Sequence, residues 1–524
     1  MLKFISFFIY FLRWDLKRFN KKNSYYDFCK LVNEFNRNLT IKKAINNQPN
    51  LIFKFLKINK NIFEIALRQK ILKFYSPPYG SLFYYLSISK HIPLLLPVPS
   101  GWFRLIKNNQ IGLKFNFFVS FVNNFLISLV IHISVLKILF LFLFCRKNKN
   151  SNYSFIFDPE INSINNTTYK TEKLTNWILK NFNDSGDLAH PYQNVAEYSF
   201  DSKKIKPISK NMYLMFDLNF FSKIKVLYYF IILNILSFLY LLLGKWHFSF
   251  MLPDLFLNII TKHAKKNNLA NYYFFSYGSF IYRPLWTYEA EELGSKIICY
   301  NYSVNFRFHL YKNEYPPQEI GFEALSWPKV LTWSNQYINY HKKFFITNPF
   351  VKTSYIMNTD TEEPLILPKK YILIFDIAPV RKLFSQLIFP LPDYLNGRNA
   401  VKFLMDILDI CEENKLNVLW KPKRQHRSFV DKSYHFFINE IIKKYKCLTI
   451  INPLHSPYKL CQKATAVVST PFTSTAYIGK LCNTPSIYYD SSGILNKKDK
   501  GSHGMPLIKD KESLKNWLIT HYRN

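Results

Sequence analysis

The segment TAVVSTPFTSTAYIGKLCNTPSIYYD, residues 465–490, contains the pattern that decides the fold of this chain. An apolar run at 466–469 is typical of a buried β-strand, a helix-like stretch follows it, and a second strand-like run ends at Asp490. Two strands connected through a helix lie parallel in one sheet. The turn between strand and helix is unusual, because residues 469–475 carry five hydroxyl side chains where apolar ones are expected.

The alternation of strands and helices continues on both sides of this segment. Strand-like YILIFDI, NVLWKP and LTIIN precede it, so residues 366–524 are predicted to form one Rossmann-like domain, a parallel sheet with helices on both faces. A similar rhythm, carried by SFIFD, NYYFFSY and KIICYNYS, predicts a second such domain over residues 151–365. The polar, acidic stretch NTDTEEPLILPKK marks the linker between them. The predicted fold class is therefore α/β.

The hydroxyl-rich turn is the first candidate site. Ligands of open α/β sheets bind beyond the carboxyl ends of the strands, where this turn is expected to lie. We expect Thr470 to cap the following helix and Pro471 to occupy its first turn, so that backbone N–H groups near residues 472–474 point outward. Such a helix start binds phosphate, although the hydroxyls are also compatible with a purely structural cap. The predicted ligand-binding residues here are Ser469, Thr470, Phe472, Thr473 and Ser474.

Polar residues after the other strands extend the candidate site. The run KPKR supplies Lys421, Lys423 and Arg424, and we add Arg381 and Asp490 as donor-binding residues. In a chain with a formal net charge of +36 a basic loop is often only solvated, but its place after a strand favours binding. The chain has neither G-x-G-x-x-G nor a P-loop motif, which weakens a dinucleotide oxidoreductase or P-loop nucleotidase.

Metal chemistry has little support in the sequence. The seven cysteines are scattered without metal-ligand spacing, which also indicates a reducing compartment. The nearest acidic pair, Asp158 and Glu160, is more typical of a turn after a strand than of a metal site. We therefore expect a metal-independent site without a cofactor. The candidates for a general base are Glu289 and Asp376, with the alternatives that Glu289 is a solvated carboxylate and that Asp376 only orders a loop through Arg381.

Residues 1–150 are expected to form a mostly helical, membrane-associated region. Apolar runs at 124–144 and 226–244 are long enough to cross a bilayer. If both crossed, the polar segment between them would lie on the opposite side from the rest of the domain, so we expect one span or none, with helices in or on the membrane face. Buried core helices are the alternative. The positive charge fits phosphate-bearing partners or an anionic membrane, but an AT-rich genome explains it equally well.

Several segments of the chain resemble one family, the bacterial polysaccharide biosynthesis PFTS-motif proteins, whose name-giving tetrapeptide stands at 471–474. Together the similar segments span roughly residues 280–520, and long shared strings are more specific than a short motif. The chain departs from the family pattern at KPKR, where a more basic run is expected, and at the Thr before PFTS. The similar segments are YRPLWTYEAEELGSKIICYNYS, WPKVLTWSNQY, IFDIAPVR, VVSTPFTSTAYIGKLCNTPSIYYDSSG and HGMPLI.

The resemblance implies surface-carbohydrate assembly, such as capsule or lipopolysaccharide, by a two-domain glycosyltransferase of the B type. In such a fold the two Rossmann-like domains face a cleft and the nucleotide-sugar is bound mainly by the carboxyl-terminal domain. The hydroxyl pairs and the basic loop are similar to donor sites for CMP-sugars, which we favour over UDP- or GDP-sugars. The expected acceptor is a glycan or a lipid-linked sugar at the cytoplasmic face of the inner membrane. The alternatives are a nucleotide-sugar epimerase and a non-catalytic membrane-attached scaffold; a nucleic-acid binder ranks last because no recognition module is present.

Overall fold

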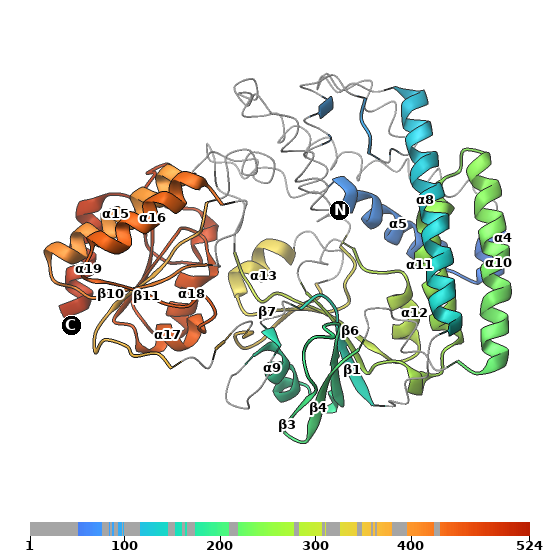
Figure 1. Ribbon diagram of the computed structural model, residues 1–524, viewed down its shortest axis with the longest axis horizontal. Helices are drawn as coiled ribbons and strands as arrows, with labels where there is room; N and C mark the ends of the chain where they lie inside the picture. The colour runs from blue at the N-terminus through green and yellow to red at the C-terminus, as the bar shows by residue number, and fades with distance from the viewer. Residues whose placement is uncertain are drawn as a thin grey trace.

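A computed structural model gives the architecture of the chain (Figure 1). It describes residues 51–75, 116–144, 152–159, 173–208, 218–276, 282–305, 325–342, 348–357, 364–379, 396–423 and 430–523, with isolated residues between 83 and 98 and at 163–164, 310 and 360–361. These residues form two α/β parts, each built on its own sheet, and a layer of long helices. The first fifty residues of the expected N-terminal region lie outside the described part of the chain.

The N-terminal sheet has eight strands in the order β3-β4-β2-β1-β5-β6-β7-β8. Every neighbouring pair is parallel except β3 and β4, which form an antiparallel edge. Its central strands are buried along their whole length, which explains why they read as continuous apolar runs. The strands are β1 Tyr153–Ile156, β2 Asp187–His190, β3 Tyr198–Phe200, β4 Lys203–Pro207, β5 Tyr272–Ser276, β6 Lys296–Tyr300, β7 Val330–Thr332 and β8 Phe350–Lys352.

The C-terminal sheet has six strands, all parallel, in the order β11-β10-β9-β12-β13-β14. The predicted parallel sheet of this half is therefore confirmed. Strand order runs outward in one direction from β9 to β11 and in the other from β12 to β14, so the sheet has a topological switch point between β9 and β12. The strands are β9 Ile372–Phe375, β10 Val418–Lys421, β11 Leu448–Ile450, β12 Ala466–Ser469, β13 Ser486–Tyr489 and β14 Leu507–Ile508.

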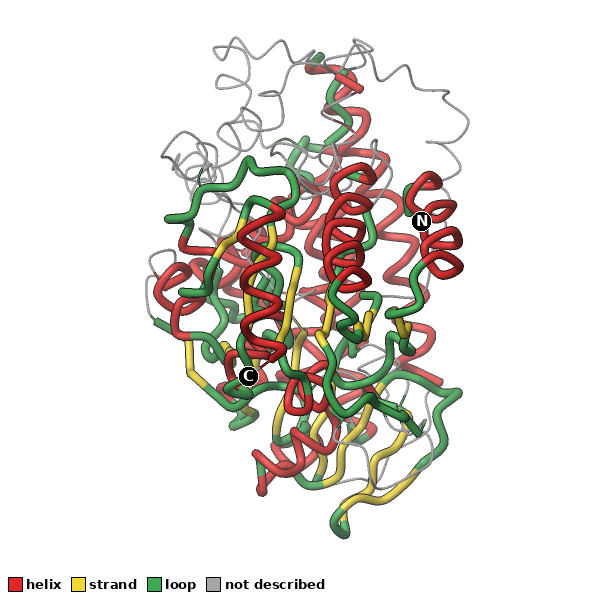
Figure 2. Tube along the Cα trace, turned by 90° about the vertical axis from the view of Figure 1, so that its left-hand side faces the viewer, coloured by secondary structure: helices red, strands yellow, loops and turns green. Residues whose placement is uncertain are grey.

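Helices cover both faces of the C-terminal sheet, as Figure 2 shows from that side of the molecule. Ile372 and Ile374 of β9 point into a core under one set of helices, whereas Leu373 and Phe375 point to the opposite face. That opposite face belongs to the same hydrophobic cluster as the core of the N-terminal sheet, so apolar packing is continuous between the two parts. The helices are α15 Gly397–Glu413, α16 Lys432–Lys444, α17 Pro457–Lys463, α18 Ser474–Leu481 and α19 Lys511–Arg523, with the 3-10 turn η10 Lys500–Ser502.

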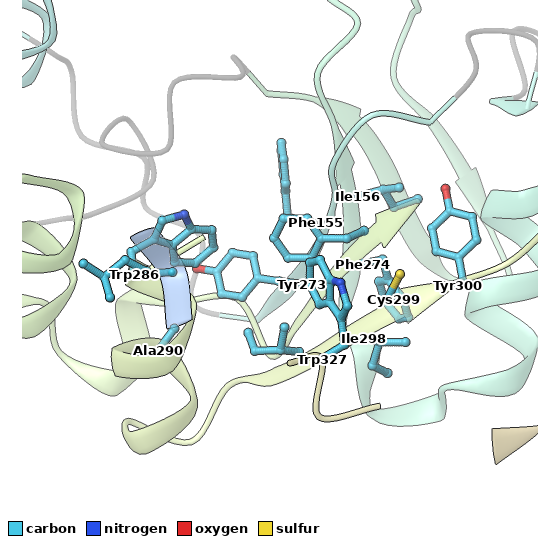
Figure 3. Close-up of a cluster of buried hydrophobic side chains, with 14 of the residues drawn as sticks. Phe155, Ile156, Tyr273, Phe274, Trp286, Ala290, Ile298, Cys299, Tyr300 and Trp327 are labelled. Atoms are coloured by element: carbon cyan, nitrogen blue, oxygen red, sulfur yellow. The ribbon is translucent and has the colours of Figure 1, made fainter. Parts of the chain in front are cut away.

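Aromatic side chains dominate the core beside the N-terminal sheet (Figure 3). Trp286 of helix α12 stands edge-on to Tyr273 of β5 at a centroid distance of 4.9 Å, and Trp327 packs on Phe275 at 5.0 Å. Rings of this size bury large apolar areas and fix the angle between helix and sheet. The remaining elements around this sheet are α9 Leu174–Asn181, η4 Asn183–Ser185, η6 Lys266–Asn268, α12 Trp286–Glu292 and α13 Asn335–His341.

A layer of helices lies on the far side of the N-terminal sheet from the C-terminal sheet (Figure 1). Two of its members, α8 and α10, are long and apolar enough to cross a membrane by length and composition. Both leave many large apolar side chains exposed, so the alternative of buried core helices does not describe them. The layer consists of α4 Leu51–Leu56, α5 Lys60–Tyr75, α8 Phe117–Phe144, α10 Phe220–Leu242 and α11 His247–His263.

The change from one sheet to the other falls between Lys352 and Ile372, the stretch that contains the predicted linker. Each strand-like or helix-like segment named above forms the expected kind of element. The strands β2, β3, β4, β7, β8 and β14 had no counterpart among those segments. Four of them, β3, β7, β8 and β14, have only two or three residues, and β2 and β4 contain charged residues that interrupt the apolar pattern. The division into three domains at 150 and 365 stays a prediction.

Candidate functional site

The switch point of the C-terminal sheet places Asp376 and Thr470 side by side, since they follow the neighbouring strands β9 and β12. The Thr470 backbone N–H donates to the Phe375 carbonyl at 3.0 Å. In sheets of this kind the ligand crevice forms at the switch point. A small hollow opens here, with a volume of about 20 Å³, room for a group the size of a water molecule. Its lining comes from three strand ends and the first turns of α15: Asp376, Ile377, Asn399, Ala400, Phe403, Thr470, Pro471, Tyr489, Asp490 and Ser491.

The start of α15 contributes polar backbone to this hollow, a feature that the sequence analysis did not identify. Asn396 caps the helix by accepting a hydrogen bond from the Asn399 N–H at 2.8 Å. Ser491 fixes the other side, because its hydroxyl donates to the Asn399 carbonyl at 2.8 Å. A helix N-terminus carries partial positive charge, so an anionic group is stabilised beside it. The signal that could have found it is Asn396 followed by a helical apolar period.

Asp376 is buried, with 5% of its surface exposed, at the floor of the hollow. Burial raises the pKa of its carboxyl, and the hydrogen bond from the Tyr434 hydroxyl partly opposes that shift. The Tyr434 hydroxyl donates to Asp376 Oδ2. A carboxyl with a raised pKa takes up and releases a proton closer to neutral pH than an exposed one. Arg381, its expected partner, lies outside the described residues.

The two described lysines of the basic loop after β10, Lys421 and Lys423, differ in their surroundings. Lys421 is buried, and its Nζ donates to the Pro453 carbonyl at 2.7 Å. Burial lowers the pKa of Lys421 to about 8, while the nearby Asp376 charge raises it. Lys423 is exposed, and Arg424 lies outside the described residues. Lys421 thus contributes a cation of reduced proton affinity behind the strand ends, and Lys423 faces solvent.

The PFTS turn differs from its prediction at the helix start. Helix α18 begins at Ser474 with Thr473 as its N-cap, so the expectation that Thr470 caps the helix and Pro471 opens it is wrong. The reason is Phe472, whose φ of +61° puts it in the left-handed region and inserts a turn before the helix. Phe472 is 1% exposed and packs edge-on to Tyr488 at 5.8 Å. The strained backbone is thus held by a buried aromatic ring.

Most hydroxyls of the turn are engaged within the protein. Thr473 Oγ1 donates to the Thr470 carbonyl at 2.8 Å, and Thr475 Oγ1 donates to Ser469 Oγ at 3.0 Å. Ser474 bonds outside its own sheet: its N–H and its hydroxyl both donate to Asn305 Oδ1, at 2.7 and 2.6 Å. The Val304 N–H donates to Ser474 Oγ at 3.0 Å. The first N–H of the helix is therefore directed at the N-terminal part of the molecule and not at the hollow.

His503 makes a second polar connection between the two sheets. Its Nε2 lies 3.0 Å from the Val304 carbonyl, so Nε2 carries the proton, and its Nδ1 lies 3.0 Å from the Ser334 hydroxyl. Its ring stacks on Tyr477 of α18 at 5.0 Å. Burial lowers the pKa of His503 to about 4. We call the set Val304, Asn305, Ser334, Ser474 and His503 the joint, because it ties loops after β6 and β7 to the PFTS helix and the HGM segment.

Of the two remaining predicted residues, Glu289 lies apart from the hollow and Asp490 is part of its lining. Glu289 sits in α12, which packs against α11; half-burial raises the pKa of its carboxyl, with Lys262 lowering and Glu292 raising it. Among the described residues no contact brings Glu289 to Asp376. Asp490 is buried and orders its own loop, accepting hydrogen bonds from the Ser492 N–H at 3.1 Å and the Leu495 N–H at 2.8 Å.

Comparison with known proteins gives one match by sequence. A model of the family described as polysaccharide biosynthesis PFTS motif protein matches residues 232–518. No curated protein matches the chain.

Solved structures match it only distantly. The wall teichoic acid polymerase TagF is 10% identical with a TM-score of 0.37, over 75% of this chain and 88% of that chain. The UDP-GlcNAc 2-epimerase of Methanocaldococcus jannaschii is 10% identical with a TM-score of 0.35, over 71% and 93%. TarM is 11% identical with a TM-score of 0.27, over 49% of each chain. Likenesses this distant carry no argument about the site.

Proposed function

The chain belongs to the polysaccharide biosynthesis PFTS motif family, and from that membership we propose that it is a glycosyltransferase-like enzyme of surface polysaccharide biosynthesis. It transfers a sugar from a nucleotide-sugar, for which we favour a CMP-sugar, to a glycan or lipid-linked acceptor without a metal ion. Its two α/β parts correspond to the B-type glycosyltransferase architecture, and the helical layer associates it with the cytoplasmic face of the inner membrane. The observation that carries the proposal is the hollow at the switch point, where a helix start meets a buried carboxyl.

The donor phosphate is assigned to the start of α15 and the PFTS turn. In the transfer, the bond between the anomeric carbon and the phosphate oxygen breaks, and negative charge builds on the leaving nucleotide. The partial positive charge at the start of α15 and the hydroxyl of Thr470 are suited to stabilise that charge. Lys421, held behind the strand ends, adds a positive charge that needs no metal ion.

The acceptor hydroxyl attacks the anomeric carbon and must give its proton to a base. Asp376 is the stronger of our two candidates, because it lines the hollow and burial raises the pKa of its carboxyl. Glu289 also has a raised pKa, but it lies against α11. In the proposed reaction the proton passes to Asp376, and the nucleotide leaves with the electron pair of the broken bond.

The test measures the melting temperature of the purified full chain with CMP, UDP or GDP. A ligand that binds only the folded protein at 100 times its Kd stabilises it by about 2.7 kcal/mol, which corresponds to a rise of several degrees. We expect CMP to give the largest rise. The variant Ala400→Leu, which fills the hollow, should abolish it, whereas the matched neighbour Val401→Leu should retain it.

Two outcomes separate the alternatives. If none of the nucleotides stabilises folded protein, the donor site is refuted. If Asp376→Asn still binds nucleotide and cells carrying it make normal polymer, Asp376 is not the base; if Glu289→Gln also leaves the polymer normal, the chain acts as a scaffold. Loss of polymer with retained nucleotide binding supports catalysis by Asp376.

A further inference from the structure

We propose that helices α8 and α10 form a seat on an anionic lipid bilayer and lie in the plane of the membrane within one leaflet, without crossing it. This inference deepens the membrane association included in the proposed function by naming the surface, the lipid charge and the orientation. It does not depend on transferase activity.

Both helices expose one apolar stripe along their whole length. On α10 the large exposed side chains recur every three or four residues from Phe220 to Leu243, and on α8 they run from Phe117 to Phe144. Helices of 23 and 28 residues are about 35 and 42 Å long, so the face is far larger than the isolated apolar contacts of an ordinary surface. Its members are Phe117, Phe118, Phe121, Leu126, Val130, Ile133, Leu136, Phe140, Leu143, Phe144, Phe220, Phe221, Ile224, Tyr228, Ile231, Ile235, Phe238, Leu239, Leu242 and Leu243.

The polar side chains of the same helices point inward. His132 of α8 lies 2.8 Å from Asn234 Oδ1 of α10 and 3.0 Å from Ser249 Oγ of α11. Ser249 in turn donates to the Ser237 carbonyl at 2.9 Å. Because these groups lie between the three helices, the outer face is left almost free of hydrogen-bonding groups. A face of this kind gains free energy in lipid rather than in water.

The positive charge on and around α8 and α10 favours anionic lipids. Residues 116–144 and 218–253 contain no Asp or Glu but four lysines, Lys137, Lys223, Lys225 and Lys245. Lys137 lies on the exposed side of α8, and the other three flank α10 at its two ends. Lysines around an apolar face bind the headgroups of anionic lipids. A second copy of this chain would instead bring like charges together.

The packing of α11 determines how α8 and α10 can lie relative to the bilayer. Helix α10 runs beside α11 along its length, with Tyr229 against His263 at one end and Tyr240 against Phe248 at the other. Helix α11 is almost wholly buried and packs in turn against α12, which covers the N-terminal sheet. If α10 crossed the bilayer, α11 and α12 would enter it too, together with the charged pair of Lys70 and Asp254 and the exposed Glu291 and Glu292. A bilayer can therefore meet only the outer face of α8 and α10.

This orientation places the N-terminal α/β part, which we expect to bind the acceptor, next to the lipid. The N-terminal sheet lies between the helical layer and the C-terminal sheet, so the proposed donor half projects away from the membrane (Figure 1). An enzyme that glycosylates a lipid-linked acceptor needs that order, because the acceptor reaches it from the bilayer and the nucleotide-sugar from solution.

The first experiment is vesicle flotation of the purified full chain. We expect binding to vesicles with about 30% phosphatidylglycerol in phosphatidylcholine, and weaker binding to pure phosphatidylcholine. The double variant Val130→Glu with Ile235→Glu should lose binding by about tenfold or more, since it puts two charges into the apolar face. The control Phe436→Glu replaces an exposed aromatic side chain on α16, and this variant should bind vesicles as the unchanged chain does. Each variant's melting temperature with nucleotide reports whether its donor site is intact, separately from lipid binding.

The second experiment measures depth. A fluorophore on a cysteine introduced at Phe220, Ile231 or Leu242 is quenched by lipids brominated near the headgroup or near the chain end. In-plane helices predict the same shallow quenching at all three sites; a helix that crosses predicts deep quenching at Ile231 alone. Deep quenching at the middle site, absence of vesicle binding by folded protein, or a dimer that persists with vesicles and is broken by the double variant would each overturn the proposal.

Discussion

Ser474 ties the two halves of the molecule together with four hydrogen bonds from one residue, one of them with the Ser303 hydroxyl at 2.8 Å. Its N–H and hydroxyl both reach Asn305, and its oxygen accepts from the Val304 N–H. Ser474 and Val304 are buried and Asn305 is partly buried, so a lost bond leaves a polar partner poorly satisfied. The residue that ends the family's name-giving motif is therefore structural at least in part, whatever the motif binds.

We expect Ser474→Ala and Asn305→Ala each to lower the free energy of unfolding by about 1–3 kcal/mol, because each leaves buried partners unpaired. The double variant should cost less than the sum, with a coupling energy of about 0.5–3 kcal/mol, measured by urea unfolding of the four chains. Thr520→Ala, which removes a hydroxyl bonded only within the exposed face of α19, is the control and should change little. Strict additivity of the two substitutions would contradict the contact.

At the scale of the element, α18 lies unusually close to the sheet because of Gly479. A Cβ at this position would come within 2.2 Å of Ser486 Oγ on β13 and 3.1 Å of Val467 Cγ2 on β12. The glycine is needed for space and not for a left-handed backbone.

Gly479→Ala should therefore destabilise the protein by about 1–3 kcal/mol despite the higher helix propensity of alanine, because the methyl group overpacks the contact. Ser486→Ala removes the nearest atom and should recover part of the loss in the double variant, as judged from urea midpoints. If Gly479→Ala stabilised the chain, as it does at an open helix position, the close packing of α18 would be wrong.

The sequence predicted elements better than the contacts between them. Strands β9, β10, β12 and β13 and their helices followed from apolar runs and periodicity, because burial on both faces leaves a strong local signal. The helix start at Ser474 was misplaced because nothing local announces that Phe472 adopts a positive φ. The partner of Ser474 could not be found either, since Asn305 lies 169 residues away in the chain. Which hydroxyls are free to bind a ligand depends on those distant partners.

At the scale of the whole molecule, aromatic contacts accompany the polar contacts of the joint. Trp333 stacks on Tyr477 at 5.5 Å and Tyr355 on Tyr458 at 5.4 Å, each pair joining the two halves. Together with the hydrophobic cluster that the two halves share, these aromatic pairs pack the halves against each other. His503 sits in the middle of this contact and is held neutral, since Nε2–H donates to Val304 while Nδ1 accepts from Ser334.

This arrangement makes the molecule sensitive to acid. The folded-state pKa of His503 is about 4, against an ordinary value of 6.5, so between these pH values the unfolded chain binds more protons than the folded one. The free energy of unfolding is therefore full above pH 6.5 and falls as the pH drops to 4, by at most about 3 kcal/mol for this residue. Burial lowers the pKa values of His190 and His247 to about 4 as well, and they add losses in the same direction.

Replacing His503 should change how the free energy of unfolding depends on pH, and not only its value at pH 7. His503→Asn tolerates the φ of +51° at this position, so it removes the ring without straining the turn. We expect a chain that is less stable at pH 7 but whose free energy of unfolding depends less on pH between 6.5 and 4, measured by urea unfolding at each pH. His521→Asn, on the far helix α19, should leave the slope unchanged. If the slopes of the His503 variant and the unchanged chain coincide, His503 is not buried in a neutral form, and the polar contact that fixes the two sheets to each other is not the one described.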